Sequence, residues 1–235
     1  MVRLSNTNSQ LPVNSSLHHV CPPFAPRKTG KTITENTVVV KSAAPSAQFT
    51  QATLLEKVKN SVVRIEVTSP LGKGVGSGFA ADSSGLILTA NHIIVDSQKI
   101  EVKLQDGTIY QATVQKRDMI RDLALIKIEA SLPALTIGDE GWLGVGTEVG
   151  LYGFPGGVQN LVSSNGYISA FLTNESIGIT YLETDSKSAP GGSGGPLVNP
   201  SGHVVGMLTL GKTGITTLDR GYTISCTTLK DFLSK

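Results

Sequence analysis

Short runs of β-branched and apolar residues, separated by glycine, proline and polar residues, follow one another from about Ala52 toward the end of the chain. Runs of this composition, bounded by turn residues, are typical of β-strands. Six runs precede a break over residues 131–141 and six follow it, so the pattern predicts two all-β barrels or sandwiches. The predicted strands are residues 62–68, 76–81, 86–89, 100–104, 111–115 and 123–128, then 147–152, 166–171, 179–183, 196–198, 204–210 and 221–224.

Helical patterns are confined to the two ends of this β region. A short helix is predicted over residues 53–59, and a second over residues 227–233 closes the chain. The chain contains 26 glycines, as many tight β corners require, because a residue with a positive φ angle rarely carries a side chain. The pattern therefore predicts an all-β fold class with one leading and one C-terminal helix.

Residues 1–50 differ in composition from the rest of the chain. They are rich in Ser, Thr, Asn and Pro, and they contain five basic residues but a single acidic one, Glu35, whereas the remainder has 15 basic and 17 acidic residues. The segment offers too little apolar surface to form a core, so we predict a flexible arm. An organellar targeting segment has the same acid-poor, hydroxyl-rich composition, and both interpretations stay open.

Several classes of protein do not fit this sequence. No run approaches the roughly 18 consecutive apolar residues of a membrane span, and no apolar stretch follows Arg3 as in a secretory signal peptide. We therefore expect no membrane span and no secretion, and an intracellular location, cytosolic or organellar, is favoured. The formal charge is only +2 and no basic run is present, so nucleic acid is not an expected partner.

Cysteine and histidine are too sparse for a disulfide framework or a metal site. Cys21 and Cys226 are the two cysteines of the chain. His18, His19 and Cys21 lie close together in the arm, but no second pair of ligands follows at zinc-site spacing. We expect no metal and no organic cofactor, and a reducing compartment fits the cysteine content.

One serine has the setting of a catalytic nucleophile. Ser193 is flanked on both sides by paired glycines in the segment Ala189-Pro190-Gly191-Gly192-Ser193-Gly194-Gly195-Pro196-Leu197. A bend of this kind can expose a hydroxyl while nearby main-chain N–H groups converge on a developing oxyanion. Taken alone, the segment is equally compatible with a flexible Gly-Ser turn.

The partners of such a nucleophile lie upstream of it. His92 follows the apolar run at residues 86–89, and Asp122 opens the run at residues 123–128. The chain order is therefore His, Asp, Ser, which is the order of a chymotrypsin-type triad. In α/β hydrolases the catalytic histidine follows the serine in the chain. Here the one histidine after Ser193 is His203, which lies in a predicted turn.

Together these segments resemble the trypsin-like serine proteases, and specifically the protease domain of the HtrA/Deg family. The resemblance covers roughly residues 55–234 and implies two six-stranded, chymotrypsin-like β-barrels with a cleft between them. Within a protease domain at residues 51–235, the barrels would occupy about 60–130 and 143–225. The blocks that carry the resemblance are residues 76–79, 85–92, 118, 122–127, 135–139, 152–156, 184–185, 190–197 and 205–206.

The resemblance implies a role for each residue of the candidate site. Ser193 would be the nucleophile, His92 the general base and acid, and Asp122 the residue that orients the histidine. The N–H groups of Gly191 and Ser193 would form the oxyanion hole. Residues that would contact the substrate, on the pocket walls or on the strand that pairs with the substrate, are Lys187, Ser188, Thr209, Leu210, Gly211 and Gly221.

The sequence departs from its relatives at two points. Gly192 replaces the asparagine that HtrA relatives carry before the serine, and the 42 residues after Ser193 are too few for a PDZ domain. We expect a serine endopeptidase that cleaves polypeptide substrates through an acyl-enzyme. The alternatives are a scaffolding protein that retains the protease fold and a viral polyprotein protease. A homo-oligomer or complex formed through the N-terminal arm also stays open.

Overall fold

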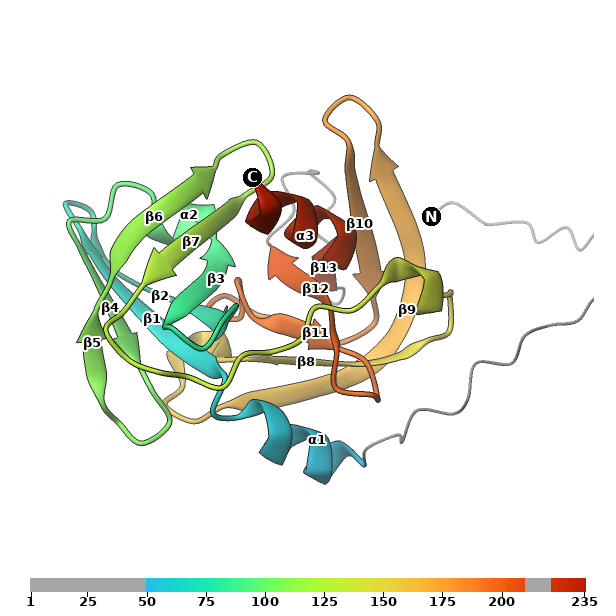
Figure 1. Ribbon diagram of the computed structural model, residues 1–235, viewed down its shortest axis with the longest axis horizontal. Helices are drawn as coiled ribbons and strands as arrows, with labels where there is room; N and C mark the ends of the chain where they lie inside the picture. Colours follow the sequence, from blue (N-terminus) through green and yellow to red (C-terminus); the bar gives the residue numbers. More distant parts are fainter. Residues whose placement is uncertain (1–49, 210–220) are drawn as a thin grey trace, which may run out of the picture. The chain divides into compact units, whose positions relative to one another are not determined.

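The computed structural model describes residues 50–209 and 221–235. The predicted all-β class is confirmed, because the described residues form two β units with short helices around them. Figure 1 shows the first unit in blue to green and the second in yellow to red. The predicted arm, apart from Thr50, lies outside the described residues.

The first unit is a curled antiparallel sheet of seven strands. Its order is β5-β4-β1-β2-β3-β7-β6, so β5 and β6 are its two edges. These edge strands are consecutive in the chain and are separated only by Ala112. The strands are β1 (Val62–Ser69), β2 (Gly72–Ala80), β3 (Leu86–Ala90), β4 (Lys99–Lys103), β5 (Ile109–Gln111), β6 (Thr113–Asp118) and β7 (Leu123–Lys127).

The bend at Ala112 corrects the predicted six-stranded N-terminal barrel. The expected strand at residues 111–115 is replaced by two short strands, of which β5 pairs with β4 and β6 pairs with β7. Ala112 donates its N–H to the carbonyl of Ile100 at 2.9 Å, and the chain then turns toward the opposite edge. The sheet is thus closed by the continuing chain at one bend and not by a ladder between its two edge strands.

The second unit is the closed six-stranded barrel that the sequence predicts. Its strand order is β10-β13-β12-β11-β8-β9, and all of its pairings are antiparallel. Closure leaves no free sheet edge. The strands are β8 (Glu148–Gly153), β9 (Val162–Asn174), β10 (Ile179–Thr184), β11 (Pro196–Val198), β12 (Val204–Thr209) and β13 (Gly221–Ser225).

The described residues also form three short α-helices and two 3₁₀ turns, of which α1 precedes the strands and α3 follows them. The two predicted terminal helices are α1 (Gln51–Val58) and α3 (Cys226–Ser234). The additional elements are α2 (Asn91–Ile94), η1 (Glu140–Trp142) and η2 (Pro155–Gly157). Thr50 caps α1, because its hydroxyl accepts the N–H of Thr53. No helix in the described ranges is both long and apolar enough to cross a membrane.

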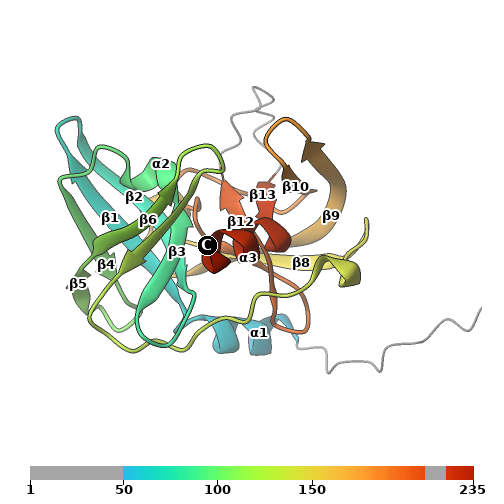
Figure 2. The same ribbon diagram turned by 45° about the horizontal axis from the view of Figure 1, so that its top comes forward.

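The two units share one layer of buried apolar side chains, which is called the seam from here on. Successive residues of a strand point to opposite faces, so a strand buried on both faces serves two cores. Ile87 packs into the core of the curled sheet while the next residue, Leu88, packs into the seam. Leu151 and Tyr152 divide in the same way between the barrel core and the seam. Both α1 and α3 add apolar side chains to this seam, which joins the two halves. Figure 2 shows the ribbons of these two helices between the strands of the first unit and those of the second.

Phe232 of α3 tests how much the seam stabilises the fold. Its side chain is 2% exposed and belongs to the seam, and the ammonium of Lys116 lies 4.5 Å from its ring centroid. We predict that Phe232→Ala lowers the free energy of unfolding by about 3 to 5 kcal/mol, because it leaves a cavity. Urea denaturation measures this change. Leu71, which is 98% exposed, supplies the control, since Leu71→Ala should change stability by about 0.5 kcal/mol or less.

Candidate active site

His92 and Asp122 meet through two hydrogen bonds. His92 lies in the first turn of α2, directly after β3, and Asp122 immediately precedes β7. The imidazole Nδ1 lies 2.7 Å from Asp122 Oδ2, and the main-chain N–H of His92 donates to Oδ1 at 2.8 Å. An ionised carboxylate can only accept hydrogen bonds, so Nδ1 carries a proton, and in the neutral ring Nε2 is then the nitrogen with the free lone pair.

Asp122 is also fixed by its main chain and by the barrel. Its φ angle is +58°, and its carbonyl accepts the N–H of Asn91 at 3.1 Å. Asp122 thus accepts two N–H groups that α2 leaves unpaired at its start. Thr209, at the end of β12, donates its hydroxyl to Asp122 Oδ2 at 2.5 Å. The carboxylate of Asp122, at the start of β7, therefore bonds both to His92, which follows the end of β3, and to Thr209 at the end of β12 in the barrel.

The surroundings of Asp122 favour its ionised form. Burial alone would raise the pKa of this carboxyl, but the side-chain hydrogen bonds from His92 and Thr209 outweigh it, and the pKa lies below its ordinary value of 3.8. The side chain is 17% exposed, against 32% for His92. A carboxylate with a lowered pKa next to an imidazole stabilises positive charge on that ring.

Ser193 lies in the buried segment between β10 and β11. The residue is fully buried, and its Oγ has no hydrogen-bond partner within the described residues. Nε2 of His92 is likewise shielded from solvent and unpartnered there. A buried hydroxyl and a buried ring nitrogen without partners are uncommon in folded proteins, and such groups call for an explanation.

The main chain around Ser193 is almost completely hydrogen-bonded. Each of four successive carbonyls accepts a donor: Pro190 from Gly156 N–H at 2.6 Å, Gly191 from the Ser77 hydroxyl at 2.7 Å, Gly192 from Gly195 N–H at 3.0 Å and Ser193 from Ser77 N–H at 2.8 Å. The N–H groups of Gly192, Gly194 and Gly195 also donate to main-chain carbonyls. The N–H groups of Gly191 and Ser193 make no hydrogen bond in the described part of the chain.

Glycine is required at two positions in this loop. Gly194 has a φ angle of +85°, and a Cβ there would lie 2.1 Å from the carbonyl oxygen of Ser77. Gly191 has a φ angle of +94°, and its Cβ would lie 2.6 Å from the carbonyl oxygen of Phe154. Since both contacts are with main chain, no side-chain movement would relieve them. The glycine pairs thus allow the loop to pack directly against β2 and η2.

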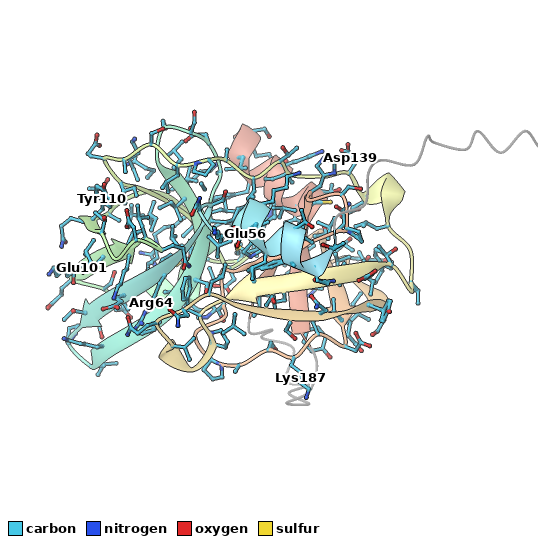
Figure 3. All side chains as sticks on the ribbon, turned by 90° about the horizontal axis from the view of Figure 1, so that it is seen from below. Glu56, Arg64, Glu101, Tyr110, Asp139 and Lys187 are labelled. Carbon is cyan, nitrogen blue, oxygen red and sulfur yellow. The ribbon has the colours of Figure 1, made fainter. Side chains whose placement is uncertain are left out.

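A small hollow opens beside the loop. Leu151, Val162 and Leu208 supply apolar side chains to its wall, and Gly192 borders it on the side of Ser193. Lys187 also borders the hollow, but this residue is exposed, and Figure 3 shows its side chain extending away from the ribbon. The hollow is therefore a mainly apolar pocket with a lysine at its rim.

The structure brings together some of the predicted substrate-contacting residues. Lys187 and Ser188 border the hollow, as expected. Thr209 is bonded to Asp122, and Gly221 lies against Thr184, whose Oγ1 is 3.0 Å from where a Cβ of Gly221 would stand. Neither Thr209 nor Gly221 borders the hollow. The predicted residues Leu210 and Gly211 lie outside the described residues.

Other residues at the site had not been assigned from the sequence. Leu151 and Val162 line the hollow, and their strand positions carry no signal that separates them from ordinary core residues. Ser77 is bonded to the loop, and its only sequence signal is its place between Gly76 and Gly78. His92 was expected at a strand end but lies in α2, because the polar pair Asn91-His92 starts a helical turn whose N–H groups Asp122 accepts.

The lowered pKa of Asp122 gives a pH-dependent contribution to stability. Since the folded-state pKa lies below the ordinary value of 3.8, the contribution is present above pH 4 and is lost as the pH falls through the folded pKa. We predict that wild type is more stable than Asp122→Asn at pH 6 and that the difference narrows below about pH 4. Urea denaturation from pH 6 to pH 3 measures it. A difference that stays constant over this range would contradict the assignment.

The chain was compared with protein families and known proteins. The model of the trypsin-like peptidase domain matches residues 76–207. "Serine protease HTR4" of Bos taurus is 39% identical over 175 residues, which cover 68% of this chain and 36% of that protein. Mitochondrial "Serine protease HTRA2" of the same species is 33% identical over 208 residues, covering 82% and 44%. This chain thus spans less than half the length of both relatives.

A bacterial relative and a solved structure extend the comparison. "Putative serine protease HhoA" of Synechocystis is 36% identical over 144 residues, which cover 58% of this chain and 36% of that protein. The structure titled "HtrA-type protease AlgW with tripeptide" superposes with a TM-score of 0.71 at 28% identity, covering 78% of this chain and 62% of that one. With the family model matching more than half of its length, this chain belongs to the trypsin-like peptidase family and is related within it to the HtrA proteases.

Proposed function

We propose that this chain is a serine endopeptidase that cleaves polypeptides through an acyl-enzyme on Ser193. The observation that carries the proposal is the pair of unbonded N–H groups, on Gly191 and Ser193, beside a buried hydroxyl that also lacks a partner. The His92–Asp122 pair would supply the base that such a hydroxyl requires. Membership of a peptidase family supports the same conclusion.

The first chemical step would be attack of Ser193 Oγ on the carbonyl carbon of the scissile peptide. Nε2 of His92 would accept the hydroxyl proton, and Asp122 would stabilise the resulting imidazolium. The same proton would then pass to the departing amine as the C–N bond breaks. Water, activated by Nε2 in the same way, would release the acyl group and restore Ser193. No cofactor is needed for any of these proton transfers.

The Gly191 and Ser193 N–H groups would stabilise the oxyanion of each tetrahedral intermediate. They are already fixed before substrate arrives, so they need no reorganisation during the reaction. Donors of this kind typically contribute a factor of about 10² to 10³ each to the rate. The Pro190 carbonyl, which lies on the opposite side of its peptide group from the Gly191 N–H, is bonded to Gly156 and stays out of the site.

The substrate side chain before the cleaved bond would enter the hollow beside Gly192. Leu151, Val162 and Leu208 make this wall apolar, so an aliphatic side chain is favoured over a charged one. Lys187 is turned to solvent and does not select acidic residues. The substrate backbone would pair with the end of β12 at Thr209, as an added β-strand.

Removal of the nucleophile gives the direct test of the proposed function. We predict that Ser193→Ala and His92→Ala each lower kcat for a casein-derived peptide by about 10⁶-fold, and Asp122→Asn by about 10⁴-fold. A fluorophosphonate probe should label wild type at Ser193 and leave Ser193→Ala unlabelled. Hydrolysis by purified Ser193→Ala at the wild-type rate would contradict the assignment of Ser193 as the nucleophile. Absence of labelling in folded wild type would favour the scaffolding alternative.

Substrate preference is tested with a peptide library varied at the residue before the cut. Burial of an aliphatic side chain in the hollow stabilises the complex by about 1.5 to 3 kcal/mol, so Val, Leu or Ala should be preferred. Lys187→Ala should leave this preference unchanged. A preference for Asp or Glu that disappears in Lys187→Ala would show that the lysine ammonium enters the pocket.

A further inference from the structure

Ser77 joins the curled sheet to the loop that carries Ser193. It lies on β2, and it is fully buried on the strand face that it shares with the seam residue Phe79. Its hydroxyl donates to the carbonyl of Gly191 at 2.7 Å and accepts the N–H of Phe154 at 2.9 Å. Its main-chain N–H donates to the carbonyl of Ser193 at 2.8 Å.

These contacts fix the directions of successive peptide groups. In a trans peptide the C=O and the N–H point to opposite sides, so a carbonyl held by one partner determines where the next N–H points. Ser77 holds the carbonyls of Gly191 and Ser193, which lie on either side of Gly192. The peptide group between these two, whose N–H belongs to Ser193, therefore has a neighbour held by Ser77 on each side, while its own carbonyl, that of Gly192, accepts the Gly195 N–H at 3.0 Å.

The Ser77 hydroxyl also determines where the loop stands relative to η2. By accepting the Phe154 N–H, it binds the residue directly before η2, and Gly156 of η2 in turn donates to the Pro190 carbonyl. That carbonyl belongs to the peptide group whose N–H is on Gly191. Through one buried hydroxyl, Ser77 is therefore linked to both unbonded N–H donors of the site.

We propose that Ser77 is a positioning residue for the oxyanion hole, an inference that rests on the proposed function. Its hydroxyl holds the peptide groups of the Ser193 loop in the orientation that presents the Gly191 and Ser193 N–H groups to substrate. Ser77 itself does not touch the reacting atoms. Thr89 secures Ser77 from the neighbouring strand β3, because its buried hydroxyl donates to the Ser77 carbonyl at 2.7 Å.

Loss of the hydroxyl should affect the transition state more than substrate binding. In Ser77→Ala the Gly191 carbonyl and the Phe154 N–H lose their partners in a buried place, so the loop can reorient to satisfy them. We expect kcat for a chromogenic peptide with Val before the cut to fall by about 10- to 100-fold, with KM within about 3-fold. The Ki of the matching peptide boronic acid, whose oxygen occupies the oxyanion position, should rise by the same factor as kcat/KM falls.

Ser97 offers a matched control in the first unit. Its hydroxyl also donates to a main-chain carbonyl, that of Ile94, at 2.7 Å, but among the described residues no hydrogen bond joins it to the Ser193 loop. Ser97→Ala should keep kcat and the boronate Ki within about 2-fold of wild type. A Ser77→Ala protein that behaves like Ser97→Ala would overturn the inference. If Ser77→Ala does not fold, Ser77→Cys takes its place: its thiol is a weak donor, so wild-type kcat in that variant would equally overturn the inference.

Amide hydrogen exchange separates this inference from the proposed function. Phe154 N–H donates to the Ser77 hydroxyl, so its exchange in Ser77→Ala should be at least about 10-fold faster than in wild type, with no change in Ser97→Ala. The measurement needs no turnover. If wild type fails to hydrolyse peptides, the proposed function falls, while unchanged Phe154 exchange in Ser77→Ala would refute the role of Ser77 whether or not the protein is a peptidase.

Discussion

A buried loop must find a partner for almost every main-chain N–H and C=O, and this constraint governs the segment around Ser193. The residues from Gly191 to Gly195 are fully buried, and the carbonyls from Pro190 to Ser193 all have donors. Because the partners of these carbonyls include Ser77 of β2 and Gly156 of η2, the loop cannot hold its conformation without both halves of the fold. Within the described residues, the N–H groups of Gly191 and Ser193 are the exceptions to this pattern, because neither has a hydrogen-bond acceptor.

The seam between the halves explains how so much polar main chain can be held in place. Strands with both faces buried place one set of side chains in their own core and the alternate set in the seam, as Leu88 and Tyr152 do. Hydrogen bonds join the halves beside this apolar layer, among them one between Thr209 and Asp122 and another between Ser77 and Gly191. In this low-dielectric setting, hydrogen bonds are strong and unpaired groups are costly, so the site is rigid for the same reason that the fold is stable.

Much of the fold was predictable from the sequence, because alternating apolar runs and glycine-rich corners report directly on strands. The closed barrel and both terminal helices agree with that pattern. The bend at Ala112 was not predictable, since it depends on which edge strand each half of the run pairs with. The helix α2 was missed because its first N–H groups are capped by Asp122, 30 residues away in sequence.

The residues of the candidate site likewise divide into those that could be predicted from the sequence and those that could not. His92, Asp122 and Ser193 have chemically distinctive side chains in distinctive settings, so they could be singled out before any geometry was known. Ser77 and Leu151 could not, because a serine between glycines and a leucine in a strand acquire their roles only from the residues that the fold brings beside them. The domain boundaries drawn from the sequence and the role of residues 1–50 remain predictions.

We propose that the N–H groups of Gly191 and Ser193 are held in place, before substrate binds, to receive an oxyanion. This proposal is best tested by a crystal structure of the protein with a peptide boronic acid bonded to Ser193. We expect a boronate oxygen within about 2.7 to 3.1 Å of both the Gly191 and the Ser193 nitrogen, with the Pro190 carbonyl still bonded to Gly156. An adduct whose oxygen contacts neither nitrogen, or a Pro190 carbonyl turned into the site, would contradict it.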